Sequence, residues 1–247
     1  MLASIFSLIG DDRERREHRV FTMLLQSIPG LEERLMSSSE EEVAIVSSLI
    51  QKGAVSARSD DTKSLKRAIL DWITPKGQSL NPPLSRNVKV DRGFHHECTG
   101  YLLCPAGMDY DELRTKQLLQ DEQTVISGDQ WPIFLYRNYS YNPEDPWNGL
   151  FCSALLITTY KHIFTSPSSV DKEPKATRAE NARIHGMTKV TGASIAYVAT
   201  QVQFALSSSP VFSRTDMATD SECFYMSILN LFEDLDEQVE VSELITW

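Results

Sequence analysis

Apolar residues recur at helical spacing along most of the chain. An apolar start, MLASIFSLIG, leads into the charged stretch DDRERREHR. Ser39 and Glu42 then form a capping-box pattern ahead of three apolar residues at i, i+3 and i+7, and Gly53 is a plausible C-cap. This pattern predicts an amphipathic helix over about residues 40–52, with its apolar positions at Val43, Val46 and Ile50.

A second helix is predicted over the stretch DDTKSLKRAILDWITP. Asp60 or Asp61 would cap its start, and Pro75 would stop it. Its apolar residues share one face and are Leu65, Ala68, Ile69 and Trp72. The first 75 residues therefore predict two or three amphipathic helices.

The middle of the chain has a different texture. Between Thr74 and Asp109, prolines alternate with glycines, so only short regular elements are expected. A short helix is predicted around Glu112–Leu119, and Ile133–Tyr136 could form one short strand. The flanking prolines and glycines argue against a large sheet.

Past Pro146 the helical pattern returns. Asp145 before Pro146 suits a helix start, and the stretch PWNGLFCSALLITTYKHIF is apolar nearly all round, which indicates a buried helix. The stretch GASIAYVATQVQFALSS repeats apolar residues at helical spacing. Thr219 and Glu222 make another capping box, ahead of a last apolar face made of Phe224, Ile228, Leu231 and Phe232.

These patterns predict a mainly α fold. We expect a helical domain with an irregular Pro/Gly-rich middle segment and at most a short β-hairpin. A boundary is expected near residues 75–92. It separates an N-terminal helical segment, 1–75, from a main helical domain, 76–247, and the two could pack as one domain.

The composition is that of an ordinary soluble globular protein of 247 residues, with 41% hydrophobic and 23% charged residues. No run approaches the length of a membrane span, and the apolar start has no basic region ahead of it, so no signal peptide is expected. Four dispersed cysteines without a CxxC pair suit reduced thiols inside a cell. An intracellular location, cytoplasmic or nuclear, follows.

The net charge of −10 is concentrated at the C-terminal end. Nine acidic residues and no lysine or arginine lie between Asp216 and Trp247. The opposite balance holds over 160–190, where six lysines and arginines face three acids. The predicted contact residues of this basic segment, 161–189, are Lys161, His162, Lys175, Arg178, Arg183, His185 and Lys189.

Three interpretations of the basic segment remain open. It could be an ordered polar loop between two buried helices, a surface for an anionic partner, or a catalytic loop. Its mixture of lysine, arginine, threonine and asparagine is typical of surfaces that contact phosphate, but it lacks the exposed aromatics of a single-strand binding platform. The acidic C-terminal stretch is an obvious intramolecular partner that could cover it.

Common catalytic motifs are missing from the sequence. There is no GxGxxG, no GxxxxGK[ST], no HExxH and no GxSxG. The stretch FHHECTGYLLC holds zinc-ligating residue types, but its spacing fits no common zinc module, and a hydrogen-bonded turn is the favoured interpretation. We expect no metal and no cofactor. The zinc-type residues are His95, His96, Glu97, Cys98 and Cys104.

Two turns combine acids with tryptophans. Asp129 precedes Trp131, and Glu144 and Asp145 precede Trp147. Such pairs can bind sugars or cations, but they more often form turns whose rings anchor a loop to the core. The turn interpretation is favoured.

Several stretches closely resemble an uncharacterised domain family found in multiple copies in mushroom-forming fungi. They are GFHHECTGYLLCPAGMDY, GDQWPIFLY, TDSECFY and, most specifically, the block from His162 to Asp216. The resemblance runs from about Ile28 to the end and carries no activity. It implies a fungal intracellular protein. Family members carry a polar residue in place of Cys98 and continue past a residue like Trp247, which implies a truncated C-terminus here.

The first hypothesis for function is a non-enzymatic interaction module that uses the basic segment. Its expected partner is a protein, with nucleic acid a weaker candidate and no membrane. The alternative is an enzyme of unrecognised type, whose His95, His96, Glu97, His162 and His185 would converge in one pocket. A metal-stabilised structural protein is the third hypothesis.

Overall fold

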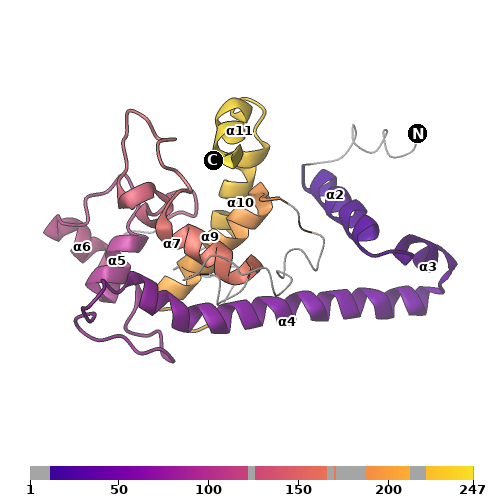
Figure 1. The fold of residues 1–247 in the computed structure, drawn as a ribbon, viewed down its shortest axis with the longest axis horizontal. Helices are drawn as coiled ribbons and strands as arrows, with labels where there is room; N and C mark the ends of the chain where they lie inside the picture. Colours follow the sequence, from indigo (N-terminus) through magenta and orange to yellow (C-terminus); the bar gives the residue numbers. More distant parts are fainter. Residues whose placement is uncertain are drawn as a thin grey trace. The chain divides into compact units, whose positions relative to one another are not determined.

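The computed structural model describes residues 12–121, 126–165, 170, 187, 189–211 and 221–246. All regular elements within these ranges are helices, which confirms the mainly α prediction (Figure 1). The longer helices are α2 (Asp12–Ser27), α3 (Leu31–Ser37), α4 (Glu40–Ile73), α5 (Glu97–Leu103), α6 (Leu113–Gln120), α7 (Ala154–Tyr160), α9 (Gly192–Leu206), α10 (Ser221–Glu233) and α11 (Gln238–Thr246).

The chain divides into two compact units, Met1–Ala57 and Arg58–Trp247. The described part of the first unit holds α2, α3 and the first half of α4. The second unit holds the remaining elements. A division into compact units does not by itself define folding domains, so the domain boundary expected near residues 75–92 stays a prediction.

Helix α4 is a single helix of 34 residues where the sequence pattern predicted two. Its predicted capping box is confirmed, because the Ser39 backbone N–H donates to the Glu42 carboxylate at 2.9 Å. The helix passes through Gly53, so the predicted C-cap there is wrong. A lone glycine costs a helix only about 1 kcal/mol, which a continuous helix tolerates. The predicted stop before Pro75 is confirmed, since the helix ends at Ile73.

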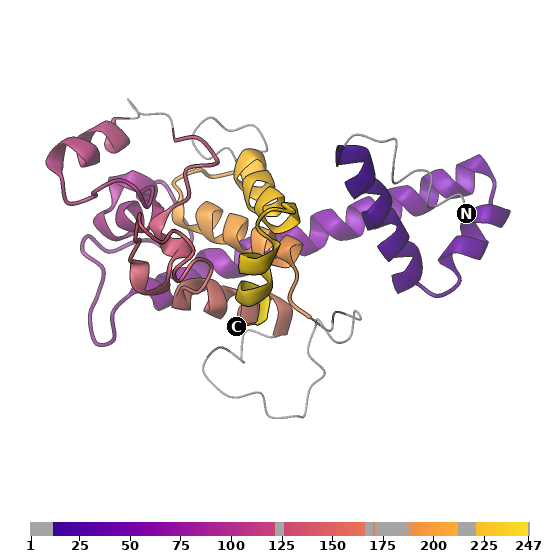
Figure 2. The same cartoon turned by 90° about the horizontal axis from the view of Figure 1, so that it is seen from above.

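The core of the second unit is built around α9. Ile195, Val198, Val202 and Leu206 are all buried, as their helical spacing predicted. Helices α7 and α10 pack on α9, and α9 and α10 lie side by side in both views (Figure 1 and Figure 2). The C-terminal half of α4 contributes Leu65 and Ile69 to the same core.

The segment between α4 and α7 is built from short pieces. Ile133–Leu135 forms a 3-10 turn, so the strand predicted over Ile133–Tyr136 is wrong. All three of its residues are buried, and this apolar run reaches the core without a sheet. Its flanks form only isolated bridges, Pro105 with Pro132 and Tyr136 with Leu150.

Helix α7 begins later than the sequence suggested. Its N-cap is Ser153, whose side chain accepts a hydrogen bond from the Leu156 N–H, whereas Asp145 and Pro146 lie in a turn. A buried hydroxyl cap at the first apolar turn is favourable, because it pairs a backbone donor that would otherwise be unsatisfied. The Thr219 cap proposed for α10 lies outside the described residues.

Candidate functional site

The predicted contact residues of the basic segment fall into two groups. Lys161, His162 and Lys189 belong to the described residues, whereas Lys175, Arg178, Arg183 and His185 lie outside them. The side chains of Lys161 and Lys189 are exposed. Within the ranges that the structure describes, neither ammonium group has an acidic partner.

The two ends of the basic segment are held together at their base. The Tyr160 hydroxyl lies 3.1 Å from the Ser194 hydroxyl, which joins the end of α7 to the first turn of α9. The ring of Phe164 packs against Tyr160 at 4.7 Å and against Tyr197 at 6.4 Å between centroids. The segment therefore leaves and re-enters the fold at one place, with Lys161 and Lys189 at its two ends.

The side chain of His162 is buried and connects the start of the basic segment to α4. His162 lies in a π-turn, Lys161–Thr165, that continues α7. Its Nε2 is 3.1 Å from the Ser64 hydroxyl, and its ring meets Trp72 edge-on at 5.2 Å. Burial lowers the pKa of His162, which favours the neutral ring. The geometry gives this histidine an anchoring position under the segment.

The later part of the acidic C-terminal stretch follows a contact close to the same base. A β-carbon on Gly192 would lie 2.5 Å from the Phe232 side chain, so the end of α10 contacts the start of α9. Glu233 and Asp234 follow Phe232 directly. Six of the nine acids of this stretch follow Phe232, which contacts the start of α9 just after the basic segment ends.

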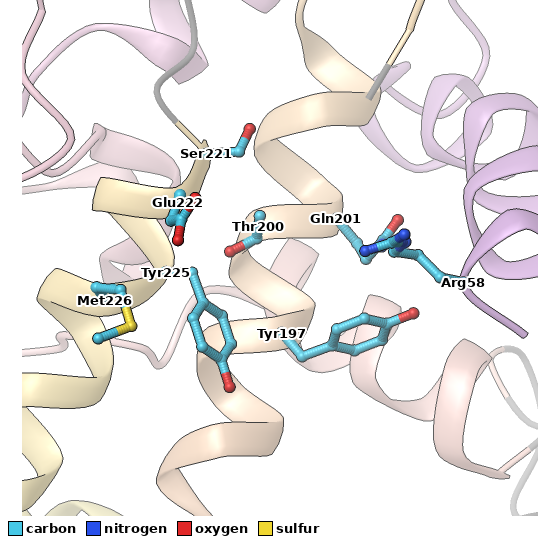
Figure 3. A pocket seen from close by; sticks show the side chains of 8 residues that line it. All are labelled: Arg58, Tyr197, Thr200, Gln201, Ser221, Glu222, Tyr225 and Met226. Carbon is cyan, nitrogen blue, oxygen red and sulfur yellow. The ribbon is translucent and has the colours of Figure 1, made fainter. Parts of the chain in front are cut away.

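A cavity of about 310 Å³ lies among α4, α9 and α10. Figure 3 shows Arg58 and Gln201 on one side of it and Glu222 on the other. Two tyrosines, a threonine, a serine and a methionine complete the lining. The lining residues are Arg58, Tyr197, Thr200, Gln201, Ser221, Glu222, Tyr225 and Met226. Opposite charges beside aromatic rings suit a small ligand with both polar and apolar parts.

A polar network joins α4 to α9 next to this cavity. The Tyr197 hydroxyl donates to the Asp61 carboxylate at 2.7 Å, and the Thr62 hydroxyl donates to the Gln201 amide oxygen at 3.1 Å. Burial raises the pKa of Asp61. Burial and the Asp61 carboxylate raise the pKa of Tyr197, and the charge of Arg58 partly offsets that rise. The Gln201 Nε2 atom itself has no hydrogen-bond partner among the described residues.

Asp60 or Asp61 was predicted to cap a helix start, and that prediction is wrong, because both lie inside α4. The Asp61 carboxylate serves as an acceptor for α9. The sequence offered a signal that was not used. Tyr197 and Gln201 are polar residues at i and i+4 on a helix that is otherwise buried, and such a pair indicates a polar partner on a facing helix.

The histidine and cysteine cluster is only partly the hydrogen-bonded turn that was favoured, because Glu97–Leu103 forms the helix α5 and His96 is its N-cap. The buried His96 lies 2.9 Å from the Pro82 carbonyl through Nε2, and its Nδ1 accepts from the Cys98 N–H at the start of α5. Glu97 pairs with Lys116 at 2.5 Å, whereas His95 is exposed. No metal-binding group of three or more such side chains occurs within the described residues.

The acid–tryptophan turns also take structural positions. Asp129, Glu144 and Asp145 are exposed, while Trp131 and Trp147 pack against the core. The Trp131 indole N–H donates to the Ser227 hydroxyl on α10 at 2.9 Å. These rings anchor their loops, as the favoured interpretation held.

Comparison with known proteins gives one match. Residues 52–247 match the model of a family of unknown function, DUF6698. No curated protein and no solved structure matched the chain. Among the helices that the structure describes, none combines the length and apolar character needed to cross a membrane.

Proposed function

The chain belongs to the DUF6698 family of unknown function, and from that premise we propose that it is a non-enzymatic binding module whose contact surface is the basic segment 161–189. The observation that carries the proposal is the closed base of this segment. The Tyr160–Ser194 contact ties the chain just before Lys161 to the first turn of α9, a few residues after Lys189, and both lysines are exposed. A functional loop on a rigid scaffold is a common way to build a binding site.

The partner that fits this surface is an anionic protein surface. The segment carries six lysines and arginines against three acids, and charge complementarity of this kind accelerates association and fixes orientation. Nucleic acid is a weaker candidate, because the whole chain carries a net charge of −10. The acidic stretch after Phe232 starts beside the same base, which makes it an intramolecular competitor for the segment.

The alternative, an enzyme with a histidine site, has less support. The lining of the cavity includes neither His95, His96 nor His162. His96 and His162 are each buried and already hydrogen-bonded to groups of the protein. Their positions suit anchoring better than proton transfer to a substrate.

We also place the module inside the cell, in the cytoplasm or nucleus. All four cysteines lie in the described residues, and none forms a disulfide. Reduced cysteines are the usual state in these compartments. The fungal origin that the sequence resemblance implies stays a prediction.

The proposal is tested with poly-glutamate and with DNA of matched charge as probes. We expect the full chain to bind poly-glutamate more tightly than DNA, and added salt to weaken the binding. Lys161→Glu with Lys189→Glu should lower the affinity about tenfold or more, since two favourable charges become repulsive.

Lys76→Glu is the matched control, because Lys76 is an exposed lysine of the second unit that does not belong to the segment 161–189. This variant should bind like the unmodified protein. Equal losses in both variants, or no binding of either probe at low salt, would refute the proposal.

A further inference from the structure

Most large apolar side chains among the described residues of the first unit are exposed. Within the described residues of this unit, Leu31 is the one large apolar residue that is buried. The exposed ones are Val20, Phe21, Met23, Ile28, Met36, Val43, Ile45, Leu49 and Val55. Helices in water gain most of their stability from packing an apolar face, so this unit needs a surface to pack against.

One stripe of α4 has the pattern of a helix-pairing seam. Glu42, Ile45, Leu49 and Lys52 follow one another at spacings of three, four and three residues. Ile45 is 54% exposed and Leu49 is 62% exposed. At 3.6 residues per turn the four side chains share one side of the helix. The seam therefore has two apolar residues at its centre, an acid at its first end and a base at its last.

We propose that this stripe, 42–52, pairs α4 with α4 of a second copy of the chain in the antiparallel direction. In that direction Ile45 of one copy faces Leu49 of the other, and Glu42 faces Lys52. Both contacts occur twice because the pairing is two-fold symmetric. A parallel pairing would place Glu42 on Glu42 and Lys52 on Lys52, which is repulsive. The charge pattern thus selects a second copy, and the antiparallel direction, as the occupant of this face.

The charged ends of the seam remain available for pairing. Glu42 gives one carboxylate oxygen to the Ser39 N–H and hydroxyl, and the group is solvent-exposed. Lys52 is exposed and has no ion pair within the described residues. Residues 42–51 also precede the region that matches the family, 52–247. The stripe, 42–52, shares no residue with the basic segment, 161–189, so the pairing does not rest on the binding function proposed for that segment.

The test is sedimentation equilibrium of the full chain between about 1 and 100 µM, a range that covers micromolar association. We expect a dimer whose fraction rises with concentration. Ile45→Glu with Leu49→Glu should give a monomer over the whole range, because two apolar contacts become buried charges. Val43→Glu is the control. Two residues turn the helix by about 200°, so Val43 lies opposite Ile45, and this variant should associate like the unmodified chain.

A charge exchange tests the antiparallel direction. Glu42→Lys alone and Lys52→Glu alone should each weaken association about tenfold, whereas the double variant should restore it, since the opposite charges then face each other again. Ser39→Ala measures the loss of the cap without a change of charge at Glu42. A monomer at 100 µM, or a dimer that survives Ile45→Glu with Leu49→Glu, would overturn the proposal. A double variant no stronger than the single variants would overturn the antiparallel pairing.

Discussion

Lys89 and Arg92 show how two buried cations can stabilise the end of a helix. Arg92 is fully buried, and its guanidinium donates to the carbonyls of Ala205 at 2.6 Å and Lys66 at 2.8 Å. Lys89 donates to the carbonyls of Phe204 and Ser209. Phe204 and Ala205 are in the last turn of α9, where carbonyls lack helical partners and the helix dipole favours positive charge. The two cations therefore act as a C-terminal cap for the central helix.

This arrangement makes stability depend on pH near neutrality. Burial, with the charges of Arg92 and Lys66, lowers the pKa of Lys89 from 10.5 to about 7. Above pH 7 the unfolded chain keeps a proton on Lys89 that the folded chain releases, so the free energy of unfolding should rise with pH. The slope from this group is at most about 1.4 kcal/mol per pH unit, and it vanishes well below pH 7, where both states are protonated.

The measurement is urea unfolding, followed by tryptophan fluorescence, between pH 6 and 8.5. At each pH, the free energy of unfolding of Lys89→Met is subtracted from that of the unmodified protein. The difference gives the contribution of Lys89. Burial raises the pKa of Cys98, Cys104 and Cys152, which opposes the effect at higher pH, but their contribution is common to both proteins. Lys63→Met, at an exposed position, should leave the slope unchanged. A difference between the unmodified protein and Lys89→Met that stays constant with pH would contradict the prediction.

Local sequence gave no sign of this cap. Val88 and Val90 are 51% and 63% exposed while Lys89 between them is 5% exposed, the reverse of the usual preference. The cap depends on carbonyls more than 100 residues away, which no local pattern contains. For His96 the sequence predicted hydrogen bonds to backbone groups, which the structure shows, but it did not predict the helix α5 that His96 caps.

At the scale of elements, the sequence predicted a helix correctly where its buried apolar residues repeat at the helical period. It predicted helix ends wrongly where a glycine or a pair of acids within a helix resembles a cap. Helix α9 was found because its apolar residues fit the helical period and lie in the core. Helix α4 was divided in two because Gly53 and the acids at 60–61 imitate a helix end and a helix start. The cavity was missed because its lining comes from three helices that meet only in the folded chain.

The contact between α9 and α10 gives a prediction at this scale. A methyl group at Gly192 would overlap the Phe232 side chain at 2.5 Å. Gly192→Ala should therefore lower the free energy of unfolding by about 1–3 kcal/mol. Gly107→Ala is the matched control, since a β-carbon there would meet no atom within 4 Å. It should leave stability unchanged or raise it by up to about 1 kcal/mol, and urea unfolding of the two variants makes the comparison. Equal stability of both variants would show that α10 moves away from α9 without cost.

At the scale of the whole molecule, the core and the exposed apolar stripe belong to different parts of the chain. Every member of the main buried cluster lies between Leu65 and Val241, and the tryptophans at 72, 131, 147 and 247 all belong to the second unit. The stripe of α4 lies before residue 53. Stability measured by tryptophan fluorescence and self-association should therefore respond to different residues.

A shortened chain that begins at Lys52 separates these two properties. It keeps the whole buried cluster. The reference is the full-length Ile45→Glu with Leu49→Glu variant, which is expected to be a monomer. The free energies of unfolding of the two proteins, measured by tryptophan fluorescence, should agree within about 0.5 kcal/mol. The shortened chain lacks Glu42, Ile45 and Leu49, so sedimentation should find a monomer at every concentration. A loss of cooperative unfolding would mean that the first unit supports the core. A shortened chain that still dimerises would place the pairing surface in the second unit.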